Sequence, residues 1–207
     1  MIRRKRIAVL GVSMLAALGL MSVSAVGAQA GQWTINGKAL GAPGYAPFQS
    51  KGGPITISSS GVDFACPEMI SGGNLLTSGL GTAYVSLVDC TVAGSEVCDI
   101  GPKYTDLKAD LRLNADGSEL TFENVSGSLT IVSVEEECAL IEGESLSVKL
   151  SGKITANAGA DAVQLPLTFL GAKDNLSMDW GGGKAEVKGK ASMWLTGANV
   201  GKLLGAS

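Results

Sequence analysis

The sequence contains no histidine, and this absence excludes several kinds of chemistry. Ser-His-Asp triads, Cys-His dyads and metal sites with histidine ligands all need an imidazole ring. Aromatic residues are few, with four Phe, three Tyr and three Trp in 207 residues. No long apolar run follows residue 30, so no membrane-spanning helix is expected in the rest of the chain. Binding functions and carboxylate chemistry are the classes left to consider.

The first thirty residues have the pattern of a secretory signal peptide. Residues 3–6 are all basic, residues 7 to about 26 are apolar, and residues 28–30 read Ala-Gln-Ala. Signal peptidase cleaves after such a small-x-small sequence, so we expect cleavage after Ala30 and a mature chain of residues 31–207. The alternative is a retained membrane anchor, because the apolar run is long enough to span a bilayer. The expected location is therefore secreted, either extracellular or in the cell envelope.

Removal of the signal peptide makes the protein clearly acidic. Residues 31–207 carry 12 basic against 19 acidic residues, a net charge of −7. Such a chain is repelled by phosphate backbones, so nucleic acid is not an expected partner. The length suits a single domain that can bury a core.

All four cysteines, Cys66, Cys90, Cys98 and Cys138, lie in the part expected to be exported. Thiols outside the cytoplasm form disulfides, and the even number predicts two bridges. The sequence has no C-x-x-C pair, which disfavours a zinc site. Loop entropy hardly discriminates among the three possible pairings. Because Cys90 ends an alternating run and Cys98 follows a short loop, we expect the pairs Cys90–Cys98 and Cys66–Cys138.

Apolar residues after residue 30 recur with a period of two, which is typical of β-strands. In residues 107–113, LKADLRL, leucine and alanine alternate with charged residues. The turn sequence of residues 114–117 follows, which predicts a β-hairpin with residues 118–125. About ten short runs of this kind predict an all-β fold, a single antiparallel β-sandwich or barrel-like domain.

Three aromatic residues are the candidate ligand contacts. Residues 41–53, GAPGYAPFQSKGG, predict a surface loop that contains Tyr45 and Phe48. Trp180 precedes three glycines and could offer a stacking surface to a sugar ring. The alternative for each is packing in the core or against the sheet.

Four segments carry a resemblance to known exported proteins. They read VDFAC, LVDCTVAGSEVC, CALIEGESLSVKLSGKI and WGGGKAEVKGKASM. Together they resemble a group of uncharacterised, disulfide-containing, β-rich proteins secreted by soil actinobacteria, over about residues 55–190. The resemblance implies an exported β-fold and transfers no functional residue.

Carboxylates are the remaining candidates for catalysis. A glycosidase needs two that face each other at a defined separation. The sequence offers five candidates, Asp63, Glu68, Asp161, Asp174 and Asp179, and no spacing pairs them. Solvated surface acids explain them more simply.

We therefore predict a non-catalytic β-domain that binds a cell-surface or extracellular component and needs no metal or cofactor. Its contact with the membrane is expected only during export. Two other functions stay open. One is an envelope protein that contacts lipid, either a lipocalin-like carrier or a small β-barrel porin. The other is a carboxylate-dependent hydrolase acting on polysaccharide.

Overall fold

The protein is described by a computed structural model, which covers residues 31–207 except 42–43, 135–137 and 181–182. The predicted signal peptide and its cleavage site lie outside the described residues. The described chain is all-β and holds more strands than the ten expected. They are β1 (Trp33–Ile35), β2 (Lys38–Ala39), β3 (Tyr45–Ser59), β4 (Val62–Cys66), β5 (Glu68–Leu76), β6 (Leu80–Val88), β7 (Thr91–Val92), β8 (Cys98–Gly101), β9 (Tyr104–Leu113), β10 (Glu119–Ser133), β11 (Ser145–Ala158), β12 (Leu165–Leu170), β13 (Asn175–Met178), β14 (Lys184–Leu195) and β15 (Leu204–Ala206), with a 3₁₀ turn η1 at Gly197–Asn199.

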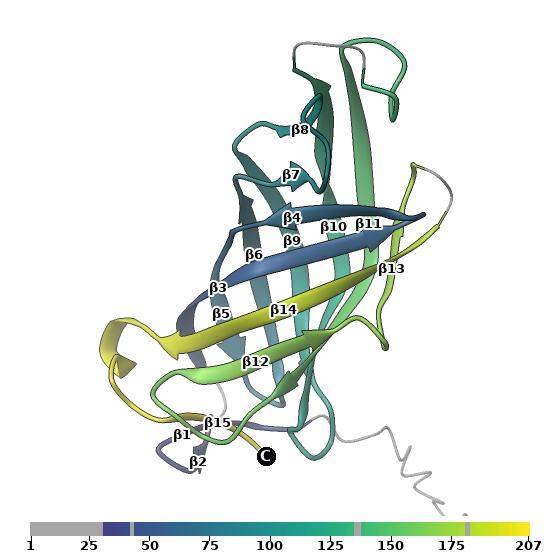
Figure 1. Ribbon diagram of the computed structural model, residues 1–207. Coiled ribbons are helices and arrows are strands. Elements are labelled where there is room, and N and C mark those ends of the chain that lie inside the picture. Colours follow the sequence, from purple (N-terminus) through teal and green to yellow (C-terminus); the bar gives the residue numbers. More distant parts are fainter. Residues whose placement is uncertain (1–30, 42–43, 135–137, 181–182) are drawn as a thin grey trace, which may run out of the picture.

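The main sheet closes on itself. Strands pair antiparallel in the order β3, β5, β6, β9, β10, β11, β12 with β13, β14, and β14 then pairs with β3. Figure 1 shows β3, β14 and β12 crossing the front of the molecule, while β6, β9, β10 and β11 run steeply behind them. The result is a flattened barrel of two layers with crossed strands, whose inner faces meet in one apolar core.

A small second sheet closes one end of the barrel. Its order is β15–β1–β2, and it lies at the lower end in Figure 1. Trp33 of β1 is buried, with 1% of its surface exposed, and its Nε1–H donates to the carbonyl oxygen of Leu80 at 2.8 Å. This indole therefore joins the small sheet to the start of β6.

The predicted hairpin around residue 115 is confirmed. β9 and β10 pair from Leu113 and Leu120 onward, and alternate residues of β9 are buried and exposed. The turn is closed by Asn114, whose Oδ1 accepts the backbone N–H of Glu119 at 2.9 Å. Charged residues occupy outward positions of β9 and leucines face the core, as the alternation predicts.

The prediction of a surface loop at residues 41–53 is wrong from Tyr45 onward. Tyr45 already begins β3, which pairs with β5 on one side and β14 on the other. Glycine permits this because Gly52 packs directly against the backbone of β14, where an added Cβ would lie 2.4 Å from the carbonyl oxygen of Lys190. Composition typical of a loop here marks close strand contact instead.

Two disulfides are present, but the predicted pairing is wrong. The bonds join Cys66 to Cys90 and Cys98 to Cys138. The register explains the first bond, because Glu68 pairs with Val88 and the two cysteines each lie two residues beyond that pair. Between Cys90 and Cys98 the chain forms β7, which pairs with β4, so the short loop extends across the barrel end instead of closing on itself.

Candidate binding surface

The barrel interior is filled by side chains. A void between the two layers has a volume of about 30 Å³ and exposes no polar atom. The void is lined by apolar residues from both layers, among them Ile55, Met69, Phe122, Phe169 and Leu176. A void of this size could hold little more than a water molecule, which would find no hydrogen-bond partner there. Sites for small-molecule ligands usually measure several hundred Å³, so the outer surface is the better place to search for binding.

The three aromatic residues chosen from the sequence do not form one site. Phe48 is buried in the core with 2% exposure, so the prediction that it contacts a ligand is wrong. Tyr45 is 69% exposed at the start of β3. Trp180 is half-buried and packs edge-on against Phe64, which pairs with Ile57 near the other end of β3.

A groove on the outer face of β6, β9 and β10 brings together groups suited to binding. Its volume is about 560 Å³. The register places Tyr84 beside Lys108 and Lys108 beside Ser126, in one row across the three strands. Ser86 and Asp106 form a neighbouring pair on the same face.

The groove lies where the sheet divides. The ladder between β9 and β10 runs as far as Leu107 and Gly127, whereas β10 begins to pair with β8 at Thr130. The two strands therefore part between these points. Gly127 also lies close against Leu107, where an added Cβ would approach a leucine methyl to 2.5 Å. Gly127 and Leu107 therefore pack closely on the inner face, and the parting of the strands leaves the outer face open beside Ser126.

The aromatic ring in this groove is open to a ligand. Tyr84 is 63% exposed, and its cross-strand neighbour on β5 is Gly72, which has no side chain to cover it. On the other flank the Nζ of Lys108 lies 5.8 Å from the ring centroid, within cation–π range. The hydroxyl of Ser86 donates to Oδ1 of Asp106 at 2.5 Å, which leaves Oδ2 free of that bond. Aromatic, cationic and acidic groups thus line one hollow.

The carboxylates proposed for catalysis lie apart. Asp63 is on β4 at the disulfide end, and Asp161 lies against Gly205 at the opposite end. Glu68 pairs with Lys51 at 3.0 Å. Asp179 accepts the backbone N–H of Lys149 at 2.7 Å. These positions do not bring two of the candidate acids to one hollow.

Asp174 joins two strands of the barrel. Its Oδ1 accepts the N–H of Thr155 on β11 at 2.8 Å, and its Oδ2 accepts the N–H of Val187 on β14 at 2.7 Å. Partial burial raises the pKa of this carboxyl above its ordinary value of 3.8, although the two backbone hydrogen bonds oppose the rise. The nearby charge of Glu186 adds to it. Both oxygens are engaged by backbone, which assigns Asp174 a structural role.

We expect Asp174→Ala to lower the free energy of unfolding by about 1–3 kcal/mol, because it strips two backbone N–H groups of their acceptor. Urea unfolding would measure this. The matched control is Asp179→Ala, since Asp179 is exposed and accepts a single backbone N–H. A larger loss from Asp179→Ala than from Asp174→Ala would contradict the assignment.

The same variant also tests the pKa of Asp174. A carboxyl whose pKa is higher in the folded than in the unfolded protein binds its proton more tightly when folded. The wild type should therefore gain stability relative to Asp174→Ala as the pH falls from neutral toward 3.8. Unfolding curves at several pH values would show the difference in free energy of unfolding between the two proteins growing as the pH falls. A difference that shrinks would mean that the pKa of Asp174 is lowered.

The sequence contained a partial signal for the groove. Alternation in TAYVSLV places Ala83, Val85 and Leu87 on the inner face, which leaves Tyr84 outward. Sequence alone could not show that Lys108 and Ser126 lie beside it, because that depends on the register of strands distant in the chain. The groove residues were therefore missed, although one of them could have been flagged as exposed.

Comparison with protein-family models found no match, and no curated protein or solved structure matches the chain. The resemblance to exported actinobacterial proteins therefore stays a prediction. No helix in the described part of the chain is long and apolar enough to cross a membrane. The groove must accordingly be interpreted from its own chemistry.

Proposed function

We propose that the protein is an exported, non-catalytic β-domain that binds a neutral glycan of the cell surface or its surroundings in the groove around Tyr84. The observation that carries this proposal is the exposed Tyr84 ring beside Asp106 and Lys108 in one hollow. An exposed aromatic face packs well against the C–H face of a pyranose ring. Export is supported by the two disulfides, which form in oxidising compartments.

The polar groups around Tyr84 suit sugar hydroxyls. Asp106 can accept hydrogen bonds from two neighbouring hydroxyls, whereas the ammonium of Lys108 and the hydroxyl of Ser126 can donate. The groove contains one carboxylate and one ammonium, so their charges cancel. This balance favours an uncharged saccharide over a polyanion, which the acidic net charge of the protein would also repel.

We expect Tyr84→Ala to weaken binding of a neutral oligosaccharide at least tenfold, because it removes the stacking surface. Calorimetry with cello-, xylo- and chito-hexaose would identify the preferred sugar and measure the loss. Tyr104→Ala is the matched control, because Tyr104 is 51% exposed on β9 and also has a lysine near its ring, Lys103 at 5.9 Å, but lies outside the groove. If none of the three sugars binds, or if the two variants bind alike, the proposal is wrong.

A further inference from the structure

Exposed apolar side chains gather at one end of the barrel. The described residues include eleven large hydrophobic side chains that are exposed, and six of them belong to the end closed by β1, β2 and β15. These six form what we term the apolar rim: Tyr45, Leu76, Leu80, Val163, Val200 and Leu203. Since a soluble surface rarely concentrates such residues in one place, the rim is a candidate contact surface.

Backbone pairing shows that the rim residues come from adjoining segments. Tyr45 pairs with Leu76, and a short turn connects Leu76 to Leu80. Leu203 exchanges two hydrogen bonds with Asn36 of the β1–β2 turn, each 2.9 Å long. The loop that contains Val200 starts where the N–H of Thr196 donates to the carbonyl of Pro47, and it ends at β15. Figure 1 shows β15 at this lower end beside β1 and β2, and the yellow chain after β14 turning at the left of the view before it returns to β15.

The position of the N-terminus suggests what the rim contacts. Gly31 is the first described residue, and its N–H donates at 2.8 Å to the carbonyl of Asn114, in the turn beside the small sheet. Gly31, the first residue of the expected mature chain, therefore lies at the rim end, directly after the expected signal peptide in the sequence. A segment that meets the membrane during export brings this end to the bilayer first.

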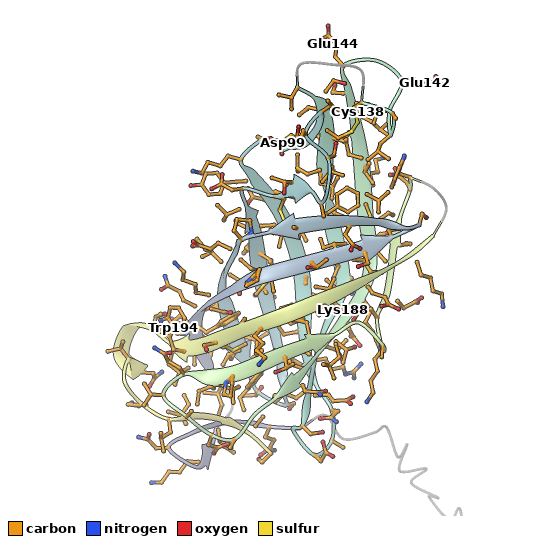
Figure 2. All side chains as sticks on the ribbon, viewed as in Figure 1. Asp99, Cys138, Glu142, Glu144, Lys188 and Trp194 are labelled. Atoms are coloured by element: carbon orange, nitrogen blue, oxygen red, sulfur yellow. A yellow bond between two sulfur atoms is a disulfide. The ribbon has the colours of Figure 1, made fainter. Side chains whose placement is uncertain are left out.

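The charges at the two ends support the same orientation. Figure 2 shows Asp99, Glu142 and Glu144 at the upper end, around Cys138. The rim end carries two basic residues, Lys38 and Lys202, and two acidic residues, Asp116 and Asp161, so its charges balance. A negatively charged lipid surface would thus repel the disulfide end, whereas it would exert little net electrostatic force on the rim end.

In contrast to the sequence-based expectation of membrane contact only during export, we propose that the apolar rim rests on the surface of a phospholipid bilayer after export, with the disulfide end turned away. The exposed rim residues enter the boundary between head groups and acyl chains, and the strands stay outside the hydrocarbon. This contact goes beyond the proposed glycan binding and does not depend on it, because the Tyr84 groove lies on the outer wall of the barrel and shares no residue with the rim.

Sedimentation with lipid vesicles tests the proposal on the exported, processed protein. The protein should sediment with vesicles of phosphatidylcholine and equally with vesicles that contain one quarter phosphatidylglycerol, because the rim end carries balanced charges. The triple variant Tyr45→Ser, Val200→Ser, Leu203→Ser should lower the partition coefficient at least tenfold. The control variant replaces three exposed apolar residues outside the rim by serine: Ile70→Ser, Tyr104→Ser and Leu170→Ser. It should partition as the wild type does.

Hydrogen exchange of the unmodified protein gives a second readout that does not depend on the folding of variants. Amides of residues 76–80 and 197–203 should exchange more slowly when vesicles are present, and those of β8 should not change. The proposal is overturned if the exported protein does not sediment with either vesicle, if both triple variants lose binding equally, or if vesicles leave exchange at the rim unchanged.

Discussion

Trp33→Ala is expected to lower the free energy of unfolding by about 3–5 kcal/mol. The indole is almost fully buried where the small β15–β1–β2 sheet closes the barrel. Its N–H donates a hydrogen bond to the carbonyl oxygen of Leu80. The substitution leaves a cavity and removes the only side-chain hydrogen bond described between β1 and β6 among residues 31–207. Urea unfolding with linear extrapolation would measure the loss.

The matched control is Trp194→Ala. Trp194 lies on the outward side of β14, is half-buried and is labelled in Figure 2. Its removal leaves no enclosed cavity, so the expected loss is about 1 kcal/mol or less. If the two tryptophan variants were equally stable, the closing role of Trp33 would be refuted.

The double variant Cys66→Ala, Cys90→Ala is expected to lose about 3 kcal/mol, because the bond restricts the unfolded chain by closing a loop of about 25 residues. The bond connects the end of β4 to the chain just after β6, so it also fixes the start of the segment that contains β7 and β8. Chemical unfolding of the variant beside the wild type would give the difference.

The same variant tests the pairing directly. With Cys98 bonded to Cys138, the double variant keeps one disulfide and should show no free thiol when it is titrated under denaturing conditions. A bond from Cys90 to Cys98 would instead leave two reactive thiols. Peptide mapping without reductant on the wild type serves as the control.

Local patterns predicted the all-β class and the β9–β10 hairpin because both depend on residues that are neighbours in the sequence. The alternation in residues 107–113 and the turn at 114–117 are adjacent in the sequence, and together they indicate the pairing of β9 with β10. The disulfide pairing could not be predicted in the same way. It depends on the register that places Glu68 opposite Val88, which is set by strands on both sides of the pair.

The candidate site depends even more on distant contacts. The sequence could place Tyr84 on an outward face, but the row Tyr84, Lys108 and Ser126 forms only when three strands align. Conversely, Phe48 stood in a segment whose glycines and prolines indicated a loop, although strand pairing on both sides buries it. The exposure of an aromatic residue in this barrel is set by its neighbours across strands, which adjacent residues in the sequence do not reveal.

Glycan binding in the Tyr84 groove is tested most directly by a two-dimensional NMR titration of the exported protein with the neutral hexasaccharide that binds best. We expect the largest amide shifts in residues 84–86, 106–108 and 126–127, and we expect Tyr84→Ala to need at least ten times more sugar to produce them. Shifts confined to the barrel interior, to the rim or to the disulfide end, or no shifts at saturating sugar, would contradict glycan binding in the Tyr84 groove.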